Sequence, residues 1–391
     1  MVALLENALL LNCSLFLIFS AYSKILSKVF LIIGIVLWFL INILKNKKRF
    51  YRYLIPANPL NRSLLIFLIA AILSTAFSQN LYHSQKIFLN RYLIYIIFAW
   101  LGCLITKSKK NLNILIGAVI LGSIVTGLGG ILDYQRFKPE RLYTTFGINI
   151  NLSFYLIMVI PLNFMVLFFI KNKFLKAGAL VATLLLLPCF IWNASRSAWV
   201  AGVFSVLFII FIKERRLALI LVVILIIANL FLPQSNKDRV AEIVGTGVLA
   251  DRPAIMESAF KIFKDYPVLG AGPGMYEKLF SQYYVAPKKY QGFTYLHAHS
   301  TYLEVMAEMG IIGLLAFLGI FTVFLINAFK TIKTTSGNKQ VILLGLTGSI
   351  IATLILSLAV TIITVGVNTS TLFWFLFGMG IALILPQSAI I

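Results

Sequence analysis

The residues best suited to chemistry lie in the run HAHSTYLEVMAEMGIIG, which begins at His297. Thr301 and Glu304 have the T-x-x-E spacing of a capping box, which predicts a helix that begins at Thr301. His299 and Ser300 then lie just outside the helix N-terminus, where the helix dipole favours an anion such as a phosphate. The same dipole disfavours a charged imidazole, so His299 is expected to be neutral near pH 7 and able to accept a proton. The alternative is an interfacial polar histidine, with His297 as a support residue in either case.

Three arginines are candidates for binding a phosphate, because a guanidinium group grips phosphate through two parallel hydrogen bonds. Arg196 lies in NASRSAW, Arg252 lies in DRP, and Arg141 begins a run that contains Asn151. Each has an alternative explanation. An arginine at a bilayer edge often extends to the lipid headgroups, as Arg196 would, and Arg252 has Asp251 beside it as an ion-pair partner. Arg141 and Asn151 either line the same cavity or complete a helix end.

The run GAGPG at Gly270–Gly274 is most simply a tight turn, with a phosphate-binding nest of backbone N–H groups at Gly272 and Gly274 as the alternative. The sequence has no acidic cluster that would hold a divalent metal against phosphates and no GxxxxGK[ST] loop for ATP. The three cysteines are far apart and lack metal-ligand spacing. We therefore expect no metal, no cofactor and a substrate that is already activated.

The composition excludes a water-soluble domain. Hydrophobic residues make up 60% of the 391 residues and charged residues only 12%, with a mean hydropathy of +0.96, whereas soluble chains carry about 25% charged residues. The net charge of +22 lies in short bursts between apolar runs, as is typical of the flanks of membrane spans. We expect membrane lipids as partners and no nucleic acid.

The hydropathy pattern predicts an all-α polytopic membrane protein of about twelve spans. Spans one to nine fall in residues 1–233 and spans ten to twelve in 297–391, and a polar insertion at 234–296 separates them. The twelve apolar runs lie near 5–22, 28–44, 62–78, 91–106, 111–131, 150–170, 174–193, 197–212, 215–233, 301–329, 339–363 and 367–387.

The basic residues of the short loops predict the orientation. Loops after even-numbered spans carry more than twice as many Lys and Arg residues as loops after odd-numbered spans, which predicts that both termini are cytoplasmic. The insertion at 234–296 would then face the outside as a small, partly helical cap. Within it, a helix is predicted from Pro253 until Pro267 stops it. Met256, Ala259, Phe260 and Phe263 would form its apolar stripe, with an ion pair between Glu257 and Lys261.

The arrangement of these residues resembles that of the O-antigen ligase superfamily, which also contains lipid-linked polysaccharide polymerases and bacterial O-oligosaccharyltransferases. His299-Ser300, nine residues and then Gly310-x-x-Gly313 fits the pattern H-[NSQ]-x9-G-x-x-G of this family. Three further segments are similar to motifs of the family: Ser195-Arg196-Ser197, Arg252 with DYPVLGAGPGMY at 265–276, and Phe146-Gly147 with Asn149 and Asn151. The two asparagines fall one residue either side of the family's asparagine. The span layout extends the resemblance to nearly the whole chain.

The resemblance implies a metal-independent, inverting glycosyltransferase of the GT-C kind, in the bacterial inner (cytoplasmic) membrane with its site facing the periplasm. Its donor would be a glycan on undecaprenyl diphosphate. Arg196 and Arg252 would bind the diphosphate, and His299 would take the proton of the acceptor hydroxyl. The acceptor favoured here is lipid A-core, as in lipopolysaccharide biosynthesis.

Other readings stay open at this point. A growing O-antigen or exopolysaccharide glycan and a protein hydroxyl are alternative acceptors within the superfamily. A lipid-linked sugar transporter is an alternative of another class, but transporters place ionisable residues near the middle of the membrane. In this sequence the middle of nearly every span lacks charge. A membrane scaffold without activity would need none of the three residues Arg196, Arg252 and His299.

Overall fold

A computed structural model describes residues 1–20, 24–45, 58–106, 108–139, 141–142, 149–230, 234, 252–284, 297–364 and 367–385. Within these ranges every regular element is a helix, which confirms the predicted all-α class. The predicted cap at 234–296 is described only at 234 and 252–284, and Phe146, Gly147 and Asp251 of the sequence predictions lie outside the described residues.

Each of the predicted apolar runs meets a helix. These helices are α1 (Val2–Phe19), α2 (Lys24–Lys45), α4 (Asn61–Ala76), α6 (Ile94–Ile105), α7 (Lys109–Phe137), α8 (Asn149–Phe169), α9 (Lys173–Trp192), α10 (Arg196–Lys213), α11 (Arg215–Leu230), α15 (Thr301–Thr334), α16 (Gly337–Leu356) and α17 (Val367–Ile384).

Among the described residues, eight helical stretches are long and apolar enough to cross a membrane, fewer than the predicted number of about twelve. Three shorter apolar stretches lie at Lys28–Leu44 in α2, Asn61–Ala76 in α4 and Thr369–Ile384 in α17. One of the eight begins earlier than predicted. It runs from Leu81 to Ile105 because α5 (Leu81–Ile87) and the π-helix η1 (Phe88–Leu93) continue into α6. Polar residues in this first part, such as His83 and Lys86, concealed it from a hydropathy window.

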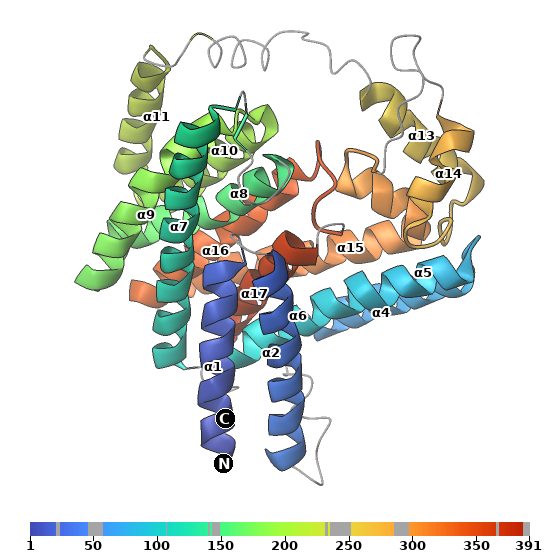
Figure 1. The fold of residues 1–391 in the computed structure, drawn as a ribbon, viewed down its shortest axis with the longest axis horizontal. Helices are drawn as coiled ribbons and strands as arrows, with labels where there is room; N and C mark the ends of the chain where they lie inside the picture. The colour runs from blue at the N-terminus through green and yellow to red at the C-terminus, as the bar shows by residue number, and fades with distance from the viewer. Residues whose placement is uncertain are drawn as a thin grey trace.

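The helices run in two main directions (Figure 1). Helices α4, α5 and α15 lie crosswise to α1, α2 and α7, and α15 packs against α4. Helix α16 packs against both α8 and α10, and α17 packs against α6. Large apolar side chains remain exposed on α2 and α11, among them Ile32, Phe39, Leu219 and Ile226, as expected of surfaces that face lipid.

Helix α16 ends at Leu356, earlier than the predicted limit of residue 363. The backbone that follows is not helical but is largely buried, and its polar groups pair with neighbouring helices. The carbonyl of Ser357 accepts a hydrogen bond from the N–H of Thr301 at 2.9 Å. The carbonyl of Ile362 accepts another from the Ser370 hydroxyl at 2.7 Å. Backbone in a membrane protein tolerates such a break only when it is paired within the protein.

Residues 252–284, the main part of the cap that the structure describes, contain two helices, α13 (Arg252–Asp265) and α14 (Met275–Tyr283), of which the sequence predicted only the first. The ion pair between Glu257 and Lys261 is confirmed at 2.9 Å. The predicted apolar stripe is wrong in part, because Phe260 is 44% exposed. The buried face is formed by Ile255, Ala259 and Ile262. These side chains share a small core with Tyr276 and Phe280 of α14 and with Ala298 and Ala307 at the start of α15.

Candidate functional site

The start of α15 is where the sequence predicted it, but its cap is a different residue. Ser300 is the N-cap, and its side chain accepts a hydrogen bond from the N–H of Leu303 at 3.4 Å. Thr301 is the first helical residue, and its hydroxyl donates to the carbonyl of Val360 at 3.1 Å and accepts from the N–H of Ile362 at 3.2 Å. The predicted Thr301–Glu304 capping box is therefore wrong. Thr301 is occupied in joining α15 to the segment after α16.

His299 has a backbone φ of 53°, in the left-handed region. Few residues other than glycine adopt this conformation, and those that do are concentrated at functional sites, where the surrounding structure holds them in place. The buried neighbours Ala298 and Ser300 flank His299, whose own side chain is half-buried. The structure therefore places His299 directly before the N-terminus of α15, as the sequence predicted.

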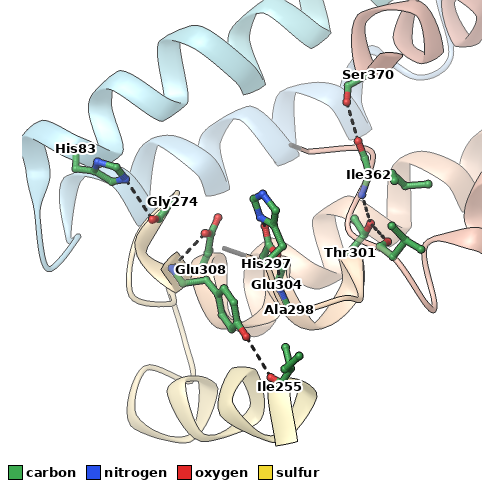
Figure 2. A network of polar contacts seen from close by, with 12 residues as sticks. His83, Ile255, Gly274, His297, Ala298, Thr301, Glu304, Glu308, Ile362 and Ser370 are labelled. Atoms are coloured by element: carbon green, nitrogen blue, oxygen red, sulfur yellow. Dashed lines mark hydrogen bonds and ion pairs between the residues drawn. The ribbon is translucent and has the colours of Figure 1, made fainter. Parts of the chain in front are cut away.

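Glu304 holds the turn that carries His299 (Figure 2). Its Oε2 accepts a hydrogen bond from the N–H of Ala298 at 2.8 Å, and its Oε1 lies 3.2 Å from Nδ1 of His297. Burial disfavours the charged imidazole of His297, but the hydrogen bond and the negative charge of Glu304 outweigh it, so the pKa of His297 is raised from its usual value. His297 thus contacts the residue that pairs with Ala298, and its role as a support residue stays a prediction. Glu304 is 3% exposed, and its two carboxylate oxygens hold the turn through these contacts.

Helix α15 is broken at Gly310, whose φ of 64° and ψ of −166° are not helical. Residues 266–272 of the cap pair with the backbone groups that the break frees. The N–H groups of Ala271 and Gly272 donate to the carbonyls of Ala307 and Glu308 at 3.0 and 2.9 Å, and the N–H of Ile311 donates to the carbonyl of Pro267 at 2.9 Å. The segment that contains GAGPG is therefore hydrogen-bonded through its backbone to the part of α15 that contains the G-x-x-G pattern.

This contact gives the glycine-rich turn a structural role. A side chain at Gly270 would collide with the carbonyl of Glu308, and one at Gly272 would collide with Ser78. Gly274 is the N-cap of α14, and its carbonyl lies 3.2 Å from Nε2 of His83. The binding of substrate by Gly272 and Gly274 stays a prediction, whereas the N–H of Gly272 is already paired within the protein.

The structure adds residues that the sequence analysis did not single out. Glu308 is 5% exposed, and its Oε1 accepts a hydrogen bond from the N–H of Tyr276 at 3.3 Å. The hydroxyl of Tyr276 donates to the carbonyl of Ile255 at 3.2 Å, which links α14 to α13 (Figure 2). Arg91 of the π-helix is close enough for its positive charge to oppose that of His297. An arginine within an apolar run was the available signal, and the sequence analysis used it only for orientation.

A second cluster forms at the turn between α9 and α10. The buried Asn193 accepts a hydrogen bond from the hydroxyl of Ser153 at 2.5 Å and donates to the carbonyl of Leu142 at 2.9 Å. Arg141 precedes Leu142, Asn151 lies in the first turn of α8, and Arg196 begins α10. Arg196 and Asn151 are half-buried, whereas Arg141 is exposed. The structure thus brings Arg141, Asn151 and Arg196 to one end of the helix bundle.

Helix α16 shows that this end is also the end where α15 begins. Gln340 near the start of α16 accepts a hydrogen bond from Lys213 at the end of α10, and further along Ser349 donates to the carbonyl of Met158. A side chain at Gly345 would meet Leu162 of α8, and one at Gly348 would meet Ile209 of α10. Residue numbers therefore rise along α16 as they fall along α8 and α10, so the helices are antiparallel. By the same register, Leu356 lies near the level of Asn151. The next residue, Ser357, is bonded to Thr301.

Arg252 reaches this end through the cap. It is the first residue of α13, is half-buried, and lies one turn before Ile255. Helix α13 packs on α15. The structure therefore places Arg196 and His299 at the same end of the bundle and Arg252 on the helix that covers the start of α15. A shared pocket for the three side chains stays a prediction. Among the described residues, no three His, Cys, Asp or Glu side chains are grouped so as to hold a metal ion.

Comparison with known proteins identifies the segment that contains this site. Residues 181–318, about a third of the chain, match the family model described as O-antigen ligase. The matched segment includes Arg196, Arg252, the glycine-rich turn, His299 and the break at Gly310. No curated protein matches the chain. Over residues 181–318, the chain is therefore similar to the O-antigen ligase family.

Proposed function

We propose that the protein is a glycosyltransferase that moves a glycan from undecaprenyl diphosphate to lipid A-core at the periplasmic face of the inner membrane. One observation carries the proposal. His299 lies in a strained conformation at the Ser300-capped start of α15, at the end of the bundle where Arg196 begins α10. A base and a phosphate-binding cation on one side of the bundle are what such a transfer requires.

The reaction is a single displacement at the anomeric carbon. The neutral imidazole of His299 takes the proton of the acceptor hydroxyl, and the hydroxyl oxygen forms the new bond to the anomeric carbon. The bond from that carbon to the diphosphate oxygen breaks, and the diphosphate leaves with the electron pair. Attack from the face opposite the leaving group inverts the configuration of the sugar.

Negative charge develops on the leaving diphosphate in the transition state, and stabilising this charge lowers the activation free energy most. Arg196 and Arg252 are the proposed counter-charges, and each begins a helix whose N-terminal dipole adds positive potential. Guanidinium groups then take the place that a divalent metal holds in other phosphate chemistry. Proton removal by a positioned base contributes about 10²–10⁴-fold to the rate.

The purified protein, supplied with undecaprenyl-diphosphate glycan, tests the proposal. Arg196→Ala and Arg252→Ala should each lower the transfer rate by about 100-fold, by analogy with the loss of one charge-stabilising group from an active site. Arg136→Ala is the matched control, because Arg136 is exposed at the end of α7 and is not part of the proposed site. Equal activity of all three variants would contradict the proposal.

The acceptor distinguishes the members of the superfamily. Lipid A-core, a second lipid-linked glycan and a protein with free hydroxyl groups are supplied in separate reactions. We expect glycan on lipid A-core. Elongated glycan would identify a polymerase, and glycosylated protein would identify an O-oligosaccharyltransferase. Movement of the intact donor across vesicles without any transfer would identify a transporter.

A further inference from the structure

A pocket lined by polar and apolar residues lies at the end of the bundle opposite His299. It has a volume of about 430 Å³ and is formed by the α6–α7, α8–α9 and α15–α16 connections together with the end of α17. Lys109, Lys171 and Lys339 line it, one from each connection or the first turn that follows it. Helix α16 is 20 residues long, or about 30 Å at 1.5 Å per residue. The pocket at its start is therefore far from His299, which lies beyond its other end.

The charge in this pocket is of one sign. Of the acidic residues that the structure describes, none lines the pocket. Lys339 is half-buried and its ammonium group donates to the carbonyl of Leu385 at 3.4 Å, while Lys109 and Lys171 are exposed at the mouth. Three ammonium groups around one cavity repel one another, so an anion between them relieves this repulsion.

The floor of the pocket is apolar. Leu112, Ile342 and Leu383 line it, with exposed fractions of 7, 0 and 5%. Polar residues, among them Ser108 and Asn113, also line the pocket. A cationic rim over an apolar floor suits an amphiphile, which places its charge at the rim and its first methylene groups below. The volume lies within the usual range of about 300–1,000 Å³ for small-molecule sites.

We propose that this lysine pocket binds a phosphate-bearing anion, and that an anionic phospholipid of the surrounding leaflet supplies it. The three lysines contact the phosphate oxygens, and the apolar floor contacts the glycerol and the upper acyl chain. The site is separate from the proposed transfer site and takes no part in the chemistry. A free phosphate ion would contact the same lysines but not the apolar floor.

Lipid binding to the purified protein in detergent tests this. Native mass spectrometry and thermal unfolding are measured with phosphatidylglycerol, with phosphatidylcholine and with inorganic phosphate. Phosphatidylglycerol should remain bound and raise the Tm, whereas phosphatidylcholine should not. The triple variant Lys109→Gln, Lys171→Gln, Lys339→Gln should bind phosphatidylglycerol roughly 100-fold more weakly, because each lysine near a lipid surface contributes about a fivefold factor. Replacement of the same three lysines by arginine should retain binding.

The control removes the same charge outside the pocket. Lys110, Lys176 and Lys333 are exposed, belong to the same three helix connections or the adjoining turns, and do not line the cavity. Their triple replacement by Gln should leave binding unchanged. Equal loss in both triple variants, or no loss in the pocket variant, overturns the proposal.

Two further outcomes are decisive. If inorganic phosphate raises the Tm as much as phosphatidylglycerol does, the pocket binds an anion, but its ligand is a soluble anion and not a lipid. If the triple variant does not fold, Lys171→Gln alone is measured, because this side chain is exposed. About fivefold weaker binding supports the proposal, and unchanged binding overturns it.

Discussion

Glu304 accepts a hydrogen bond from the backbone N–H of Ala298 at 2.8 Å, which closes the chain back onto the first turn of α15. His299 lies within the closed segment, with a φ of 53°. A left-handed conformation at a residue other than glycine costs about 1–3 kcal/mol and persists only where neighbouring contacts impose it. The bond from Ala298 to Glu304 and the Ser300 cap are among the contacts that fix the backbone on either side of His299.

Glu304→Ala should therefore lower the transfer rate because His299 is displaced, since Glu304 itself takes no part in the reaction. It leaves the N–H of Ala298 buried and unpaired, which costs about 1–3 kcal/mol, and it frees the turn that carries His299. A displacement of about 1 Å lowers a rate by up to about 100-fold. The transfer rate should fall by about 10- to 100-fold. Glu257→Ala removes an exposed carboxylate of α13 and should change the rate by less than about twofold.

The pairing of His297 with Glu304 predicts a pH dependence of stability. The pKa of His297 is raised in the folded protein, so its stabilising contribution is complete below its unfolded value of about 6.5 and is lost as the pH rises through the folded pKa. The Tm difference between wild type and Glu304→Gln should therefore be larger at about pH 5.5 than at about pH 8.5. With His297→Gln in both proteins, this dependence on pH should vanish; its persistence would assign it to another group.

Gly310 provides a test of the break in α15. Its φ of 64° and ψ of −166° lie in a region that is essentially restricted to glycine, and a side chain there would collide with the carbonyl of Val268. Gly310→Ala should destabilise the protein by about 2–4 kcal/mol, measured by thermal unfolding in detergent. Gly319 lies later in α15 with nothing within 4 Å of its missing side chain. Gly319→Ala should be neutral or stabilising by up to about 1 kcal/mol. A similar Tm for the two variants would refute the proposed geometry at Gly310.

Thr301 joins the start of α15 to the segment that follows α16. Thr301→Val removes the bond to the carbonyl of Val360 and leaves the buried N–H of Ile362 unpaired. We expect a loss of about 1–3 kcal/mol in unfolding free energy and a lower transfer rate. Thr334→Val removes an exposed hydroxyl that bonds only within its own helix and should change neither quantity. If Thr301→Val is as stable as Thr334→Val, this junction does not hold the site.

The sequence predicted the helices far better than their interruptions. Hydropathy reports which segments dissolve in lipid, so all twelve apolar runs meet helices. It does not report where the backbone leaves helical geometry. Gly310 was visible as part of a spacing pattern, but its conformation depends on the loop at 266–272 that pairs with the break. The end of α16 at Leu356 depends in the same way on Thr301.

The position of His299 could be predicted from the local sequence, because the residues that indicate a helix start lie within the next five positions. The residues that pack and bond around this helix start could not be predicted, because they come from distant segments of the chain. Tyr276 of α14 donates its N–H to Glu308, and the short helix that positions it begins after a glycine rather than at an ordinary cap. The T-x-x-E spacing also misled, since Glu304 reaches back to Ala298 instead of to Thr301.

The rate of transfer by His299→Ala tests the central claim most directly. The purified variant receives undecaprenyl-diphosphate glycan and lipid A-core, and product is measured beside donor binding. Loss of a general base should lower the rate by about 10²–10⁴-fold with donor binding retained, because the arginines that hold the diphosphate are intact. Transfer at the wild-type rate would show that the imidazole takes no part in the reaction.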